Sequence, residues 1–326
     1  MKIALDAMGS DARPAPDVEG AVMAAREFGL TIILVGDETK IKAELAKHNT
    51  AGLDLPIVHT PTEIEMTEHV DAVKSKKDAS LNVAVKLVKQ NQADAFVTMG
   101  NSGAAMAAAL LGLGRIKGIE RPAFAAVIPS GDAYVLLLDI GANAEVKPEY
   151  LYQFAWMGSI YANKVMGIAN PRVALLSNGE EEGKGTLTVR EAFARIKQSK
   201  LNFIGNAEGR HILRAFADVI VSDGFAGNVM IKTMEGTAET LIDFLKTEIK
   251  KRPLAMLGAA LAKPAFDALK KRLDYAEIGG APVLGVDGVT IIGHGRSNAK
   301  AVKNALRAAK RALDGNMLEA IRNGLQ

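Results

Sequence analysis

The sequence predicts an α/β protein with a mixed, mostly parallel sheet and helices packed on both of its faces. Apolar runs rich in β-branched residues recur along the chain, and helix-like patterns separate most of them. This alternation is typical of parallel sheets that are covered on both sides. Two runs, 124–128 and 134–139, are separated only by the short turn 129–132, which predicts a hairpin. We therefore expect three layers, α/β/α, around a mixed sheet.

In chain order, residues 2–5 form an apolar strand that ends at Asp6, and residues 31–35 form a second strand. Residues 80–89 carry apolar side chains at helical spacing. The run 95–99 stops at a Gly-Asn-Ser-Gly turn, where the alanine-rich helix 102–113 begins. Gly112 and Gly114 are typical of the C-cap and turn that end such a helix. The hairpin strands 124–128 and 134–139 follow.

After the hairpin, each apolar run again stops at a polar turn before a helical pattern. The expected strands are residues 172–177, 218–221 and 289–293, and the expected helices are residues 149–166, 186–197, 228–250 and 297–313. The last helix has an apolar stripe beside a basic one, which predicts one face in the core and one in solvent. The basic face is also able to dock an acidic protein.

Composition bounds the class of protein. A chain of 326 residues with 48% hydrophobic content is long enough for one large or two medium domains. We expect one catalytic unit, 1–326, with a central cleft, because no repeat or linker interrupts the chain. Cysteine is absent, which excludes disulfides, thiolate metal sites and a cysteine nucleophile. No signal peptide or membrane-spanning segment is evident, so we expect a cytoplasmic protein.

Six turns built from Gly with Asn, Ser or Asp follow the apolar runs. They lie at 100–103, 141–143, 177–179, 205–206, 222–228 and 293–298. If the strands are parallel, these turns gather at one edge of the sheet, where open α/β proteins bind ligands. Glycine allows close backbone approach, and N–H groups at helix starts attract anions. The pattern indicates a small anionic substrate.

Two nucleotide-binding signatures are nearly present, and both fail. The glycines of 112–118 have the wrong spacing for a dinucleotide fingerprint and follow a helix instead of a strand. Segment 179–185 resembles a P-loop but is one residue short, lacks the hydroxyl that binds Mg²⁺ and carries three glutamates. No histidine or carboxylate spacing typical of a metal site is found. We expect no cofactor, no metal and, with 5% aromatic residues, no nucleic-acid partner.

Several polar residues at these turns are candidates for a site. Lys184 lies between glycines after a strand, and ligand binding and simple surface exposure fit it equally. His294, Arg296 and Ser297 place several anion donors within one turn, which favours function. Asp6 is a weaker candidate for orienting a base, whereas Asp11 is best explained as a capping residue.

Residues 246–274 form a different kind of segment. Basic residues outnumber acidic ones there, leucines recur between them, and Pro264 divides the pattern into two short amphipathic pieces. Such a segment is suited to a dimer contact, a dock for a carrier protein or an interfacial membrane anchor. A dimer contact is the commonest of these in an enzyme, and we expect the segment to protrude from the catalytic unit.

The motifs, taken together, resemble the bacterial phosphate acyltransferases of phospholipid synthesis. The resemblance spans the whole chain and rests on the segments 6–11, 99–104, 139–143, 176–185, 205–209, 222–228 and 292–299. It implies an isopropylmalate-dehydrogenase-like fold, related to phosphotransacetylases. It also implies transfer of a long-chain acyl group from acyl-acyl carrier protein to inorganic phosphate by direct attack on the thioester. The implied partners are a second copy in a homodimer, the inner membrane surface and a membrane glycerol-3-phosphate acyltransferase.

The resemblance and the turn chemistry together suggest roles for particular residues. We expect Asn228, Lys184 and His294 to be catalytic. The expected substrate-binding residues are Asp6, Asn101, Ser102, Asn143, Asn178, Asn206, Asp223, Arg296 and Ser297. A thioester is already activated, so the protein has to supply proximity, oxyanion donors and exclusion of water.

Three other functions stay open from the residues alone. A phosphotransacetylase acting on a short acyl-CoA is the nearest. An NAD-dependent decarboxylating dehydrogenase shares the fold, although the glycine fingerprint and the metal-binding aspartates are absent. A non-catalytic adaptor for a membrane or carrier protein would use the amphipathic segment and leave the glycine turns structural.

Overall fold

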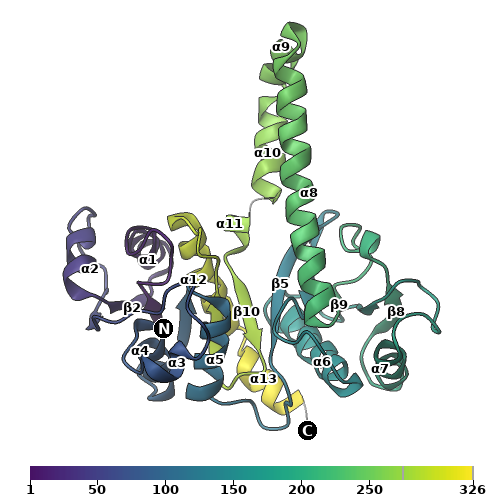
Figure 1. Ribbon diagram of the computed structural model, residues 1–326, viewed down its shortest axis with the longest axis horizontal. Helices are drawn as coiled ribbons and strands as arrows, with labels where there is room; N and C mark the ends of the chain where they lie inside the picture. The colour runs from purple at the N-terminus through teal and green to yellow at the C-terminus, as the bar shows by residue number, and fades with distance from the viewer. Residues whose placement is uncertain (274, 325–326) are drawn as a thin grey trace.

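One β-sheet forms the centre of the molecule (Figure 1). The computed structural model describes residues 1–273 and 275–324, and within them the sheet has 11 strands in the order β3-β2-β1-β4-β11-β10-β5-β6-β9-β7-β8. The strands are β1 (Lys2–Asp6), β2 (Thr31–Gly36), β3 (Ile57–His59), β4 (Ala95–Thr98), β5 (Ala123–Ser130), β6 (Ala133–Leu138), β7 (Val173–Leu176), β8 (Phe203–Ala207), β9 (Val219–Val221), β10 (Ala281–Leu284) and β11 (Val289–Ile292).

Helices cover both faces of the sheet. One face carries α1 (Ala15–Phe28), α2 (Glu38–Leu45), α6 (Pro148–Lys164), α7 (Leu187–Lys197), α12 (Ala299–Asp314) and α13 (Met317–Gly324). The other carries α3 (Ala72–Ser75), α4 (Ser80–Lys89), α5 (Ser102–Gly112) and the first part of α8 (Gly224–Lys250). A short 3₁₀ turn, η1 (Gly209–His211), follows β8.

Side chains of the strands alternate between the two layers of helices. Leu136 and Leu138 of β6 join the core beneath α6, whereas Val135 and Leu137 join the core beneath α8. Both sets are buried, which is why the strands read as continuous apolar runs. The predicted three-layer architecture and the predicted β5–β6 hairpin are therefore confirmed.

The sheet consists of two parallel halves that point in opposite directions. The first half is β3-β2-β1-β4-β11 and the second is β6-β9-β7-β8. Between them, three antiparallel pairings follow one another: β11 with β10, β10 with β5, and β5 with β6. Each antiparallel pairing reverses the strand direction, and three reversals leave the second half antiparallel to the first. The carboxyl ends of the strands in the two halves therefore lie at opposite edges of the sheet.

This reversal corrects the expectation that all the glycine turns gather at one edge. The turns after β1, β4 and β11 belong to one edge, and the turns after β6, β7 and β9 belong to the other. Gly205 and Asn206 do not form a turn at all, because they lie inside β8. The register nonetheless keeps the ends of β11 and β6 near the same level, through the pairs Ala281–Ile292, Phe124–Val283 and Ala125–Leu138.

A helical arm stands away from the sheet (Figure 1). It consists of the distal part of α8, then α9 (Pro253–Leu261) and α10 (Lys263–Leu273), and a short helix, α11 (Tyr275–Ile278), leads back to β10. The arm begins well before residue 246, and Asp274, the last residue of the predicted protrusion, lies outside the described residues. Within the part of the chain that the structure describes, no helix is long and apolar enough to cross a membrane.

Candidate functional site

The two halves of the molecule meet along α8. Asn228 and Lys232 are four residues apart and so share one face of the helix. A Cβ built on Gly141, after β6, would lie 3.8 Å from the Asn228 amide. Lys232 lies near enough to His294, after β11, to lower its pKa. We call Gly141, Asn228, Lys232 and His294 the α8 strip.

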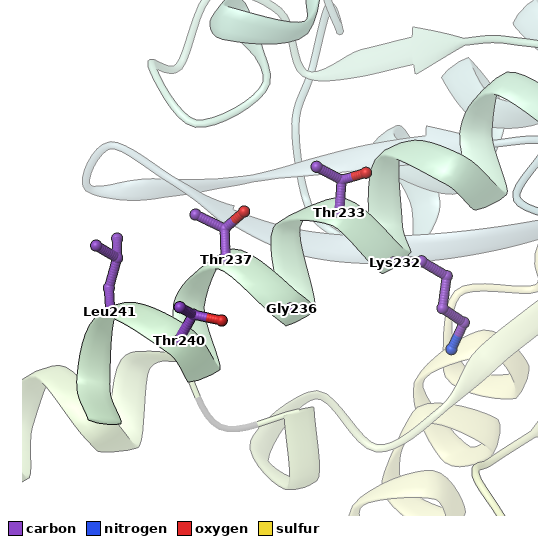
Figure 2. Close-up of a pocket in the computed structure, with 6 residues that line it drawn as sticks. All are labelled: Lys232, Thr233, Gly236, Thr237, Thr240 and Leu241. Carbon is purple, nitrogen blue, oxygen red and sulfur yellow. The ribbon is translucent and has the colours of Figure 1, made fainter. Parts of the chain in front are cut away.

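Lys232 was not predicted from the sequence. In Figure 2 it leaves α8 on the side away from Thr233 and Thr237. Its ammonium group lies 3.3 Å from the Glu235 carboxylate. From the sequence, a lysine in a long amphipathic helix is expected to be a solvated side chain. Only the folded structure, in which the loop after β11 lies close to Lys232, distinguishes this lysine from the others.

The pKa of His294 lies below its ordinary value, although the residue is exposed. Partial desolvation of the ring lowers the pKa most, and the positive charges of Arg296 and Lys232 lower it further. Its Nδ1 accepts the backbone N–H of Arg296 at 3.2 Å, which leaves the proton on Nε2. His294 therefore presents a hydrogen-bond donor at neutral pH, and the expected positive charge comes from the neighbouring cations.

The start of α5 lies beside the loop that carries His294. The N–H of Gly293 donates to the Thr98 carbonyl at 2.8 Å, which ties the loop after β11 to the end of β4. Ser102 is the first residue of α5 and is exposed. Within residues 1–273 and 275–324, the N–H groups of Ser102 and Gly103 find no acceptor. N–H groups of this kind at the start of a helix are able to donate to an anion.

Three predicted substrate-binding residues are engaged in holding loops. Asn101 accepts the Ala104 N–H at 3.0 Å and donates to the carbonyls of Met66 and Glu68 at 2.9 and 3.1 Å. Asn143 donates to the carbonyl of Pro122 at 2.8 Å and to the Asp139 carboxylate at 2.9 Å. Asp223 caps α8 by accepting the Ala226 N–H at 2.7 Å. Their side chains position the turns through capping and loop contacts.

A buried carboxylate, Asp139, organises the loop that contains Gly141. It accepts the backbone N–H groups of Phe124, Gly141, Ala142 and Asn143 at 2.7–3.2 Å. Burial raises the pKa of Asp139, and these hydrogen bonds counteract the rise. Four donors around one carboxyl fix the backbone of the loop against α8. Its position immediately after an apolar strand was the signal available in the sequence.

Lys184, Asn178 and Asn206 form a separate group beyond β9, around the loop after β7. Asn178 accepts the Gly185 N–H at 2.9 Å, and buried Asn206 donates to the Glu181 carbonyl at 2.8 Å. Lys184 is exposed and has no carboxylate within ion-pair distance in the described part of the chain. In the sheet, β9 lies between β7, which precedes this loop, and β6, which precedes Gly141.

Asp6 and Ser297 are buried at the edge of the first half, and Arg296 is exposed there. Asp6 accepts the Thr98 hydroxyl at 2.8 Å and the Met8 N–H at 3.2 Å, and burial raises its pKa. The Ser297 N–H donates to the His294 carbonyl at 2.9 Å. Ser297 therefore shapes the turn from which His294 and Arg296 project.

A hollow of about 400 Å³ runs along the outer side of α8 (Figure 2). It is lined by Lys232, Thr233, Gly236, Thr237, Thr240 and Leu241. A Cβ at Gly236 would meet no atom within 4 Å. No three potential metal ligands among the described His, Asp and Glu residues come close enough to hold a metal ion.

Comparison with known proteins identifies relatives along the full chain. A family profile described as "Fatty acid synthesis protein" matches residues 1–320. The phosphate acyltransferase of Pelotomaculum thermopropionicum is 51% identical over 327 residues, covering 100% of this chain and 95% of that protein. The phosphate acyltransferase of Heliobacterium modesticaldum is 54% identical over 324 residues, covering 98% of this chain and 96% of that protein.

The fold has relatives among solved structures as well. A phosphotransacetylase from Streptococcus pyogenes superimposes with a TM-score of 0.64 at 17% identity, covering 96% of this chain and 94% of that one. At this identity the likeness concerns the fold alone, and it agrees with the predicted fold. The full-length identity to curated relatives goes further: the chain belongs to the bacterial phosphate acyltransferase family and is an acyltransferase.

Proposed function

We propose that the protein transfers a long-chain fatty acyl group from acyl-acyl carrier protein to inorganic phosphate, giving acyl phosphate for phospholipid synthesis. The observation that carries the proposal is the α8 strip beside the start of α5. It brings an amide, an ammonium and a neutral imidazole from two halves of the molecule next to unoccupied backbone N–H groups. An anion and a developing oxyanion both need donors of this kind.

In the proposed reaction, a phosphate oxygen attacks the thioester carbonyl carbon. The carbonyl π electrons move to the oxygen, and the tetrahedral intermediate expels the thiolate when the carbonyl re-forms. The N–H groups of Ser102 and Gly103 and the charge of Lys232 would hold the phosphate. The Asn228 amide and the Nε2–H of His294 would then donate to the oxyanion. No covalent enzyme intermediate is needed, in keeping with a chain without cysteine.

In the proposed reaction, Lys184 would act at the margin of the site. Its exposure and lack of a carboxylate partner in the described part of the chain leave it available to an anionic group entering from the second half. Asn178 and Asn206 would act through the backbone of that loop. Removing Lys184 should therefore weaken substrate capture more than turnover.

The proposed partners occupy different parts of the molecule. A second copy would cover the exposed apolar residues of α8, including Phe225, Val229 and Phe244, in a homodimer. The arm's end exposes Leu254 and Leu261 beside basic residues, a composition suited to peripheral binding at the inner membrane surface. There the labile product would pass to a membrane glycerol-3-phosphate acyltransferase, and the protein would otherwise be cytoplasmic.

The experiment that tests the proposal traps acyl phosphate as hydroxamate. The wild type should form it from long-chain acyl carrier protein and phosphate. Equal or better use of short acyl-CoA would favour a phosphotransacetylase, the alternative that the fold likeness supports. Absence of product with either donor would favour the adaptor.

Variants of the α8 strip connect the reaction to the site. Asn228→Ala and Lys232→Met should each lower turnover by roughly 10²–10³, since each removes one donor. Lys246→Met is the matched control because Lys246, like Lys232, lies on α8 beside a carboxylate, at 3.0 Å. Full turnover in Asn228→Ala and Lys232→Met would exclude the assignment.

A further inference from the structure

A second cavity lies at the far end of α5 from Ser102. Its volume is about 500 Å³, and it is lined by Leu110, Arg115, Glu120, Arg121, Pro122 and Tyr150. These residues come from the end of α5, the connection to β5 and the start of α6. None of the roles assigned above uses this cavity.

Three cations lie at or beside the cavity without an ion pair, and one carboxylate, Glu120, also lines it. Arg121 and Lys147 each lie 6.0 Å from the centre of the Tyr150 ring. Together with Arg115, they are exposed and form no ion pair with any carboxylate in residues 1–273 and 275–324. Arg115 instead donates to the Glu120 carbonyl. An unneutralised cluster of this sort attracts an acidic partner at long range.

Most of the described basic side chains of the arm differ in this respect. Lys246 pairs with Asp243, Lys263 pairs with Asp267, and Glu248 accepts both Lys251 and Arg252, at 2.6–3.0 Å. Exposed pairs on one helix lose much of their attraction for an external anion. Among the described side chains, the cavity therefore has more unpaired cations than the arm, where Lys250 alone has no ion pair.

Apolar residues near the cavity and near the α8 strip belong to one hydrophobic cluster. Met106, Ala107 and Leu110 of α5 pack in the same cluster as Ile140 and Ala142, and all five are only partly buried. At the cavity, the Pro122 carbonyl accepts the Asn143 amide. Ile140 and Ala142 flank Gly141, where a Cβ would lie 3.8 Å from the Asn228 amide. Leu110, which lines the cavity, therefore shares a cluster with the residues on either side of Gly141.

We propose that the cavity is the docking surface for the acidic acyl carrier protein. The carrier's acidic face binds Arg115, Arg121 and Lys147, and its thioester-bearing arm extends over the partly buried apolar residues of α5 to the α8 strip. The inference rests on the proposed function for the identity of the carrier. In this inference the carrier binds to the body of the molecule, and the arm binds lipid and the second copy.

The position of the cavity favours a protein occupant over lipid. Gly224, the first residue of α8, donates to the carbonyl of Asn143, so α8 starts beside the loop that contacts Pro122. The 27 residues of α8 extend roughly 40 Å from there toward the end of the arm. The arm's end and the cavity can therefore be occupied at the same time, by a membrane and a soluble carrier respectively.

The test measures carrier binding directly, without turnover. Fluorescently labelled acyl carrier protein is titrated with the full chain, and anisotropy gives Kd at low and physiological salt. The double variant Arg121→Glu with Lys147→Glu should raise Kd about tenfold or more and flatten the salt dependence. Arg121→Lys with Lys147→Arg keeps the charges and should bind like the wild type. Lys40→Glu, on exposed α2, is the control for altered net charge.

A second readout uses hydroxamate formation with a short acyl-CoA, which lacks the carrier. Turnover with this donor should be unchanged in the charge-reversed variant. The inference is overturned if the wild type does not bind the carrier, if the variant keeps wild-type Kd, if both donors lose turnover equally, or if binding to anionic vesicles is lost instead. Carrier binding without any acyl phosphate would overturn the proposed function alone.

Discussion

Two carboxyl groups are buried together near the end of β1. Asp6 accepts the Thr98 hydroxyl, and Asp17 of α1 accepts the Ser10 hydroxyl, while the other Asp17 oxygen has no partner among the described residues. Burial raises the pKa of Asp6 and raises that of Asp17 well above 3.8, and their mutual repulsion adds to the rise in Asp17. Folding therefore favours the protonated form of Asp17.

This shift predicts how stability depends on pH. The contribution of Asp17 is fully present below pH 3.8, its unfolded value, and is lost as pH rises to the folded pKa. Asp17→Asn keeps the acceptor for Ser10 and removes the titration. The variant should gain stability relative to wild type between pH 4 and neutral, measured as Tm by calorimetry. Glu19→Gln, exposed on the same helix, should follow wild type. Parallel Tm curves for Asp17→Asn and wild type would contradict the prediction.

At the scale of elements, α8 begins where no side chain fits. A Cβ on Gly227 would overlap the Asp139 carbonyl oxygen, and a Cβ on Gly224 would lie 2.8 Å from the Asn143 backbone. The helix can approach the loop around Gly141 only because these two residues are glycine. This contact sets the position of Asn228 one residue later.

Gly227→Ala should therefore displace α8, cost about 1–3 kcal/mol of stability and lower hydroxamate formation strongly. Gly258→Ala, in α9, provides the comparison because its Cβ would meet nothing within 4 Å. That variant should gain about 0.5–1 kcal/mol from the better helix former. Chemical denaturation and turnover measure both. Equal effects of the two substitutions would mean that close contact at Gly227 is unimportant.

The elements that sequence patterns predicted are the long or strongly apolar ones. Strands β1, β2, β4 and β11 and helices α4 and α12 lie close to their predicted bounds. Strands β8 and β10 were missed because Gly205 with Asn206, and Pro282, are disfavoured inside strands. Their neighbours in the sheet impose the extended form. Pairing with distant strands is not visible in local propensity, and β10 is one of the strands that reverse the direction of the sheet.

At the scale of the whole molecule, the exposed apolar side of α8 predicts a dimer. Leu241 is 61% exposed beside the hollow at Gly236, and Phe244 is similarly exposed one turn further. Burying such a stripe against a second copy would be favourable. Leu241→Asp should convert a dimer into a monomer in sedimentation experiments. Leu187→Asp, at 64% exposure on α7, should leave the dimer intact. A monomeric wild type would exclude this interface.

The type of chemical group at the candidate site, hydrogen-bond donors for an anion, was predictable from the sequence. The way in which these groups come together in the fold was not. The glycine-rich turns predicted N–H donors near Ser102 and a donor at His294, and the N–H groups of Ser102 and Gly103 have no acceptor among the described residues. Asn101 and Asn143 were expected to bind substrate, but in the structure their side chains hold loops and a helix start. The sequence does not separate these roles, because an asparagine side chain uses the same amide group for both. Lys232 carried no local signal. Only the opposed directions of the two halves, and the long α8 that connects them, bring these groups together.

The place of β11 in the sheet also fixes the order in which the molecule is completed during synthesis. β11 pairs with β4, and Val302 of α12 packs 2.5 Å from where a Cβ on Gly20 of α1 would lie. The amino-terminal half of the sheet is therefore complete only when the last part of the chain has been synthesised. The second half, whose strands lie within residues 133–207 and 219–221, emerges from the ribosome uninterrupted. The strands of the second half are therefore all made within one continuous stretch, whereas β1 to β4, which pair with one another early, receive β11 and α12 only when translation is nearly over.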